Sequence, residues 1–216
     1  MSVPRITLVP MQIRAPLAGL RDRKGDRTRE RLFQAALGEF RATGYENASI
    51  GQIALRAGTS RASFYFHYPS KDAVLLDLQW RVEMELVEHA RASTGLREFL
   101  AALIDGLCQA DRGLAAGGLL RDMLSVYIRQ PAGLDLADQP FPLMVEVARR
   151  FATGRERELR AGLDPAQATE LFLAGMFGLV AGTSGAVAKR RDDLLQLAAL
   201  FLADPDPRRG GQRGPR

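Results

Sequence analysis

The sequence is poor in the residues that build disulfide frameworks and metal centres. Its 216 residues include one cysteine, Cys108, and two histidines, His67 and His89. One cysteine cannot form a disulfide within the chain, which fits a reducing cytoplasm, and we expect Cys108 to be a small buried apolar residue. A single histidine, His89, outside the basic N-terminal third does not make a metal site. We therefore expect neither a metal nor a cofactor.

Long apolar runs are absent as well. No stretch approaches the roughly 18 to 20 residues that a membrane helix needs, so we expect no membrane partner and a cytoplasmic location. The first residues scatter proline and arginine and lack the compact apolar stretch of a signal peptide. We expect residues 1–25 to form a disordered basic arm, which could alternatively bind a DNA minor groove, and residues 205–216 a disordered basic tail.

Motifs of common catalytic sites are also missing. The chain contains no G-x-S-x-G, no H-E-x-x-H and no glycine-rich phosphate loop. Without them the sequence predicts a protein that is not an enzyme. A hydrolase that uses serine and histidine is the least favoured alternative.

Charge is divided unevenly along the chain. Residues 1–72 carry a net charge of +6, residues 73–204 carry −4 and residues 205–216 carry +3. A basic front on an acidic body indicates that the front meets a polyanion, although such an asymmetry can also be only a solvated surface.

The apolar residues recur with a helical period almost throughout, which predicts an all-α fold. We find no segment with convincing two-residue alternation and no internal repeat. We divide the chain into a helix-turn-helix DNA-binding domain, 26–73, and a larger helical ligand-binding and dimerisation domain, 74–204. The expected helices cover residues 27–43, 49–57, 60–67, 71–92, 96–110, 119–128, 143–160, 164–182 and 192–203.

Helix boundaries have recognisable signals. Gly44 follows the first helix, as a glycine past a helix end should. Ser49 with Gln52 matches a capping box, and Ser60 is the expected N-cap of the third helix. Residues 164–167 combine an N-cap aspartate, a proline at the first helical position and a capping-box partner.

Two short helices joined by the tight turn at residues 56–60 predict a helix-turn-helix. In that motif the second helix enters the DNA major groove with its N-terminal end toward the bases. Ala62 and Ser63 are small enough for close approach, and the Arg61 guanidinium matches the acceptors of guanine. Lys71, at the start of the next helix, would complete a phosphate clamp.

Four aromatic residues crowd into this second helix and its end. We expect Phe64 and Tyr68 to face inward and seal a small core. Tyr65 would offer its hydroxyl to a phosphate, and Phe66 an apolar contact to a thymine methyl group. For His67 a DNA contact and a hydrogen bond between helices are equally open.

Residues 28–75 resemble the DNA-binding domain of the TetR family of bacterial transcriptional regulators. The resemblance rests on the GY…AS turn, the I-A-x-x-A-G-x-S core and the F-Y-x-H-Y-x-S-K segment. It implies an all-helical homodimer of about nine helices per subunit, whose body binds a small ligand that releases operator DNA. Departures from the family pattern are Thr59 and the long arm before residue 26. The DNA contacts that the resemblance implies are Thr28, Ser49, Ser60, Arg61, Ala62, Ser63, Tyr65, His67 and Lys71.

The resemblance also implies that the last two helices form the dimer interface, with intrachain core as the competing interpretation. The candidate interface residues are Leu171, Phe172, Gly175, Met176, Leu179, Leu194, Leu197 and Phe201. A pocket for an apolar or aromatic effector would lie among the helices of residues 75–180. Its candidate lining is Trp80, Met84, Phe99, Leu103, Leu107, Met123, Tyr127, Phe141, Met144 and Phe177.

We therefore predict a ligand-responsive homodimeric transcriptional regulator, most simply a repressor, that binds palindromic operator DNA. The alternative within the same class is a DNA-binding regulator without an effector, in which the body serves only as a dimer scaffold.

Overall fold

The computed structural model describes residues 23–114, 118–129, 141–154, 158–183 and 185–204, without the side chains of residues 23–26 and 127–129. These residues fold into helices joined by short turns, and their only β pairing is an isolated antiparallel bridge between Leu159 and Leu202. This all-α architecture confirms the predicted fold class. The elements are α1 (Arg23–Thr43), α2 (Ile50–Arg56), α3 (Arg61–His67), α4 (Lys71–Ala90), α5 (Leu96–Leu114), α6 (Leu119–Arg129), α7 (Pro142–Gly154), α8 (Pro165–Ala181), the short 3-10 helix η1 (Val187–Arg190) and α9 (Arg191–Ala199).

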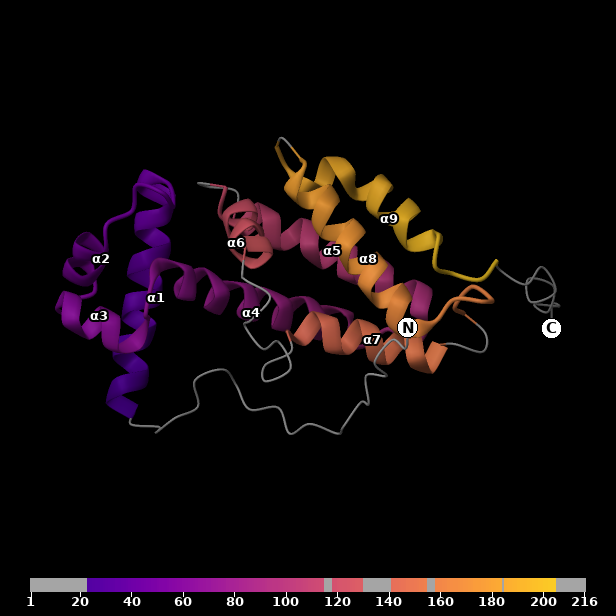
Figure 1. Cartoon of the computed structure of the whole chain (residues 1–216), viewed down its shortest axis with the longest axis horizontal. Coiled ribbons are helices and arrows are strands. Elements are labelled where there is room, and N and C mark those ends of the chain that lie inside the picture. Colours follow the sequence, from indigo (N-terminus) through magenta and orange to yellow (C-terminus); the bar gives the residue numbers. More distant parts are fainter. Residues whose placement is uncertain (1–22, 115–117, 130–140, 155–157, 184, 205–216) are drawn as a thin grey trace, which may run out of the picture.

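Helices α1 to α3 form a small head at one end of the molecule (Figure 1). Its core consists of apolar side chains that α1 presents on one stripe and that α2 and α3 cover from the other side. Phe64 and Tyr68 are fully buried in this core, as the sequence predicts. The fully or almost fully buried partners on α1 and α2 are Leu32, Phe33, Ala36, Phe40 and Ile53.

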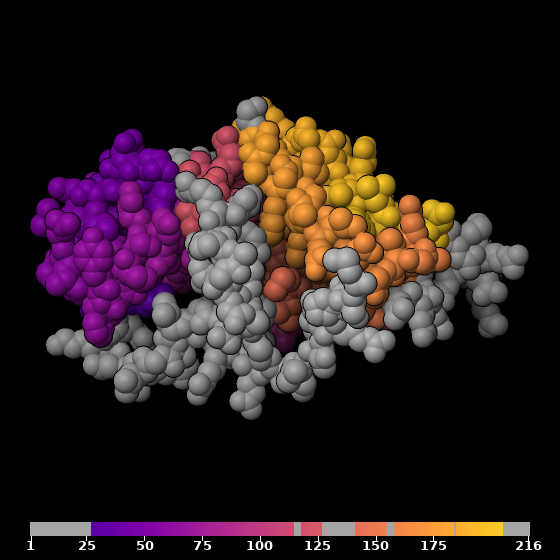
Figure 2. Space-filling view, viewed as in Figure 1, coloured from indigo at the N-terminus to yellow at the C-terminus, as the bar shows by residue number. Residues whose placement is uncertain are grey.

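Helix α4 runs from the head into the body, where it packs against α5, α6 and α7 (Figure 1). Helix α8 lies against α7 and α9, and α9 also packs on α5. Figure 2 shows the head at one end of the molecule, and α8 and α9 on this face of the other end. The rings of Phe151, Phe172 and Phe201 pack together with centroids 5.8 to 6.0 Å apart, which joins α7 and α8 to the segment after α9.

Two of the expected helices are shorter than the sequence indicates. Helix α7 ends at Gly154 rather than at residue 160, and α9 ends at Ala199 rather than at 203. The ends of the two expected helices instead pair with each other: Leu159 bridges Leu202, and the Arg160 amide donates to the Phe201 carbonyl at 2.9 Å. Such a pairing joins residues about forty positions apart and leaves no periodic signal in the sequence.

Three N-caps differ in how far they follow the sequence pattern. The hydroxyl of Ser60 accepts the Ser63 amide at 3.1 Å, and Asp164 accepts the amides of Ala166 and Gln167. Ser49 occupies the N-cap position of α2, but its side chain makes no capping hydrogen bond. The predicted capping box at Ser49 was therefore wrong.

Candidate DNA-binding face and effector cavity

The turn between α2 and α3 brings the two helices together as a helix-turn-helix. The Thr59 amide donates to the Ala54 carbonyl at 2.9 Å, and the Gly58 amide donates to Leu55 at 3.0 Å. Gly58 has φ of 63°, a left-handed conformation that a residue with a Cβ adopts only at a cost. The turn thus depends on glycine at this position.

Helix α3 divides its side chains between the core and the surface. Arg61 and Ala62 at its N-terminal end are exposed, as are Tyr65 at 48% and Phe66 at 85% of their surface. Phe64, between them, is fully buried. Exposure of a phenylalanine to this degree is costly in water, so the outer face of α3 has the character of a binding surface.

The other predicted DNA contacts differ in how exposed they are to solvent. Ser63 and His67 are half-buried, and Thr28 is half-buried on α1, while Ser49 and Ser60 are exposed. The pKa of His67 is lowered by burial and by the charge of Arg29, which favours the neutral ring.

Lys71 has a role that the sequence does not indicate. Its ammonium group donates to the carbonyl oxygens of Tyr45, Glu46 and Ala48 at 3.0 to 3.1 Å. A lysine has three N–H donors, and here all three are used by the loop between α1 and α2. Lys71 thus fastens α4 to the head, and its predicted phosphate contact stays a prediction.

A cluster of hydrogen bonds and ion pairs around Asp77 also joins α1, α3 and α4. Its carboxylate accepts the Tyr68 hydroxyl at 2.6 Å and the Arg29 guanidinium at 2.7 Å, and Arg81 donates to its other oxygen at 3.2 Å. Burial by itself raises the pKa of Asp77, but the Tyr68 hydrogen bond and the two arginines lower it overall. Arg81 also pairs with Glu30 on α1 at 2.8 Å. Sequence reasoning missed this cluster, for which only the Asp77 and Arg81 spacing of one helical turn gives a signal.

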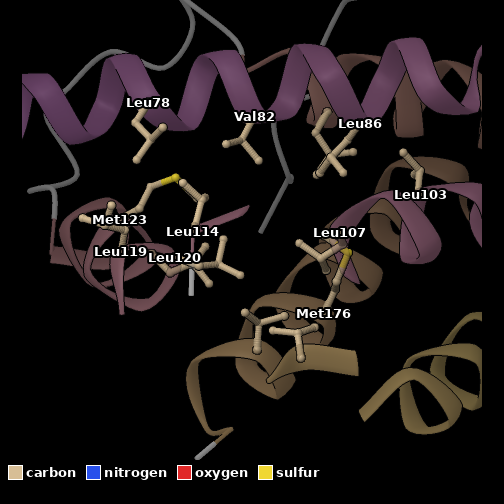
Figure 3. Packing of buried hydrophobic residues seen from close by; sticks show 14 of the residues in the cluster. Leu78, Val82, Leu86, Leu103, Leu107, Leu114, Leu119, Leu120, Met123 and Met176 are labelled. Atoms are coloured by element: carbon tan, nitrogen blue, oxygen red, sulfur yellow. The ribbon is translucent and has the colours of Figure 1, made fainter. Parts of the chain in front are cut away.

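A small cavity lies inside the body, where α4, α5, α6, α7 and α8 meet. Its volume is about 20 Å³, and apolar side chains make up most of its wall. Figure 3 shows Leu78, Val82 and Leu86 pointing from α4 toward side chains of the helices opposite, among them Leu107, Met123 and Met176.

Only part of the predicted effector lining reaches this cavity. Leu107, Met123 and Phe177 line it. Phe99 and Leu103 are buried elsewhere in the core, with Phe99 under the Arg150 guanidinium at 4.6 Å. The other candidates on the described chain are not among its lining residues: Trp80, Met84, Phe141 and Met144. The side chain of Tyr127 lies outside the described residues.

A wider cleft, of about 560 Å³, separates the head from the body. Phe33, Leu37 and Arg41 of α1 form one side, and Arg81 and Glu85 of α4 are among the residues of the other. The sequence does not predict this cleft, because its walls come from helices that only the tertiary structure brings together.

The predicted dimer residues separate into a buried and an accessible set. Phe172, Met176, Leu194 and Phe201 are at most 7% exposed and belong to the chain's own core, which favours the competing interpretation for these four residues. Both faces of α8 are apolar, so periodicity could not tell the inner from the outer face. The accessible set on α8 and α9 is Leu171, which is 54% exposed, with the half-buried Gly175, Leu179 and Leu197.

The described residues contain no group of histidine, cysteine, aspartate and glutamate suited to a metal ion. In the same part of the chain no helix combines the length and the apolar character needed to cross a membrane.

Fold and site together define a class: a helix-turn-helix DNA-binding domain on an all-helical body. Residues 32–78 match the family model for bacterial regulatory proteins of the tetR family. This region therefore carries a DNA-binding domain of the kind found in the TetR family.

Curated relatives are similar over the same region. The chain is 43% identical over 58 residues to the HTH-type transcriptional regulator TcmR of Streptomyces glaucescens, which is 27% of this chain and 26% of TcmR. It is 30% identical over 88 residues to the HTH-type transcriptional regulator SrpR of Pseudomonas putida, which is 39% of this chain and 41% of SrpR. The chain thus spans less than half the length of both relatives.

A solved structure is similar over the body as well. The TetR-family repressor FadR of Thermus thermophilus, in complex with lauroyl-CoA, superposes with a TM-score of 0.61 over 83% of this chain and 97% of FadR. The sequences are 24% identical, so this likeness concerns the fold.

Proposed function

We propose that the protein is a ligand-responsive transcriptional regulator that binds operator DNA as a homodimer and acts most simply as a repressor. The outer face of α3 carries the proposal, because it exposes Arg61, Tyr65 and Phe66 on a helix whose inner face is buried. A guanidinium can read guanine, a phenol can bind phosphate, and an apolar ring can contact a thymine methyl group.

Dimerisation would supply the second recognition helix. The outer faces of α8 and α9 expose Leu171 and Leu200 beside small residues such as Ala174 and Gly178, which allow close helix packing. In a DNA-bound dimer the two copies of α3 would lie about 34 to 36 Å apart, one turn of the duplex. The operator would then be palindromic.

An effector would act by favouring a state with a different separation of the two heads. The similarity in fold to a repressor whose structure holds lauroyl-CoA supports a small-molecule effector. The small volume of the internal cavity favours a second candidate, a regulator of the same class that needs no effector.

The test is selection of binding fragments from genomic DNA by the purified protein at near-physiological salt. Recovery of a shared palindrome is the expected result, and its loss in the Arg61→Ala variant would tie it to α3. Fragments without any shared sequence would reduce the function to nonspecific DNA association and overturn the proposal.

A further inference from the structure

Two polar side chains of α4 are buried in the apolar body. Gln79 and Glu83 stand one helical turn apart and are 1% and 3% exposed. Both line the small internal cavity, and the ten other lining residues are apolar. We call these two residues the α4 polar pair.

The hydrogen bonds of the α4 polar pair leave some of its acceptor oxygens without a donor. One oxygen of Glu83 accepts the Gln79 side-chain amide at 2.9 Å, and the other accepts the Leu143 backbone amide at 3.1 Å. An ionised carboxylate only accepts, so when Glu83 is ionised the Gln79 amide must turn its nitrogen toward it and its oxygen away. That oxygen, Oε1, is buried and has no hydrogen-bond partner among the described residues.

If the α4 polar pair served packing alone, its unpaired carbonyl would lower the stability of the fold. A buried carbonyl without a donor costs about 1 to 3 kcal/mol, and a leucine of similar size would avoid this cost. A carboxylate has room for about four hydrogen bonds, so Glu83 can accept further donors besides its two. While Glu83 is ionised, the α4 polar pair therefore lacks a donor for its free acceptors.

We propose that this cavity is the effector site and that it takes an apolar molecule carrying a hydrogen-bond donor, an amine or a hydroxyl group, which binds to Gln79 and Glu83. The inference rests on the proposed function only in calling the ligand an effector. The apolar wall would hold the body of the molecule, and the α4 polar pair would select its donor end. At a pH above the pKa of Glu83, a ligand that presents a carboxylate at this end would be rejected, because it would meet only acceptors and a negative charge.

The cavity must widen to admit such a molecule, since about 20 Å³ holds roughly one water. Two of its wall residues, Met123 and Met176, have the flexible side chains that adapt best to an altered shape. Widening would displace α4 against its neighbours. Asp77 and Arg81, which tie α4 to α1 and α3, alternate with the α4 polar pair along the same two turns of helix. Ligand binding would thus act on the helix that holds the head.

The test compares three probes with one apolar body, 4-phenylbutylamine, 4-phenylbutanol and 4-phenylbutyrate. Calorimetric titration of the protein without DNA measures each affinity. We expect the amine and the alcohol to bind at least about tenfold more tightly than the carboxylate. Gln79→Leu should weaken both by about tenfold, and Glu83→Gln should weaken the amine more than the alcohol.

Gln109→Leu, the same exchange at an exposed position of α5, is the matched control and should change none of the affinities. Unfolding in urea without probe shows that the variants still fold, because Gln79→Leu removes both the unpaired carbonyl and the amide that Glu83 accepts. Absence of binding by all three probes, equal binding of the three, or unchanged affinities in Gln79→Leu would overturn the proposal. Loss of DNA binding in a separate assay would instead overturn the proposed regulator and leave this site in place.

Discussion

At the residue scale, Arg61 is the side chain on which the proposed DNA recognition depends most. It is the first residue of α3 and is exposed, and none of the ion pairs of the described residues involves it. A guanidinium in this position is free to bind the paired acceptors of a guanine.

We predict that Arg61→Ala weakens binding to the operator by about 1 to 3 kcal/mol and relaxes its sequence specificity. Fluorescence anisotropy on operator and scrambled duplexes measures both effects. Arg112→Ala, which removes an exposed arginine of α5, is the control for charge and should leave the preference intact. An equal loss on both duplexes would show that Arg61 contacts phosphate only.

Lys71 leads to a different prediction. Because its ammonium holds three carbonyls of the loop between α1 and α2, Lys71→Ala should lower the free energy of unfolding by about 1 to 3 kcal/mol. Urea denaturation followed by circular dichroism tests this value. Unchanged stability, together with a flatter salt dependence of DNA binding, would restore the phosphate clamp that the sequence suggests.

At the element scale, the short helices of the head depend on their caps, and two serines in equivalent positions allow a matched comparison. Ser60 caps α3 with its hydroxyl, whereas Ser49 stands at the same position of α2 without a capping hydrogen bond. We predict that Ser60→Ala costs about 1 kcal/mol of stability and that Ser49→Ala costs much less. Thermal unfolding of the two variants side by side provides the test, and equal costs would contradict it.

Glu83 links two elements, because it lies on α4 and accepts the backbone amide of Leu143, the second residue of α7. Burial raises the pKa of Glu83 to about 7, from an ordinary value of 4.5. Between these values the folded protein binds a proton that the unfolded chain has released, so this group makes stability fall as pH rises from about 4.5 to 7.

We therefore predict that Glu83→Gln flattens this part of the stability profile. Urea unfolding at a series of pH values, with the parent protein beside it, measures the difference. Asp77 has the opposite effect on the pH dependence of stability. Its pKa is lowered in the folded protein, so the stability it contributes is lost as the pH falls below 3.8, the ordinary pKa of an aspartate. A parent profile that keeps its slope in Glu83→Gln would assign the titration to another group.

At the scale of the whole molecule, the DNA-binding head and the expected dimer surface lie at opposite ends (Figures 1 and 2). Ala174 is exposed in the middle of α8, between Leu171 and Gly178 on the same side of the helix. A large charged side chain there would hold two copies of α8 apart.

We predict that Ala174→Arg produces a folded monomer that binds operator at least about tenfold more weakly, because a single head reads only half of a palindrome. Sedimentation equilibrium gives the oligomeric state, and circular dichroism confirms the fold. Ala152→Arg, an exposed alanine on α7, is the control and should behave like the parent. A dimeric Ala174→Arg would move the interface away from α8.

The sequence by itself determined the helical class, most helix starts and the helix-turn-helix. These features depend on local signals: an apolar stripe of helical period, the caps at Ser60 and Asp164, and a turn that needs glycine at position 58. Tertiary structure alone decided which apolar face of α8 lies inside, what Lys71 binds and where α7 ends. It also brought Gln79 and Glu83 to an apolar cavity and Asp77 to two arginines. These outcomes depend on contacts between distant segments, and periodicity records that a residue is buried without recording what it meets.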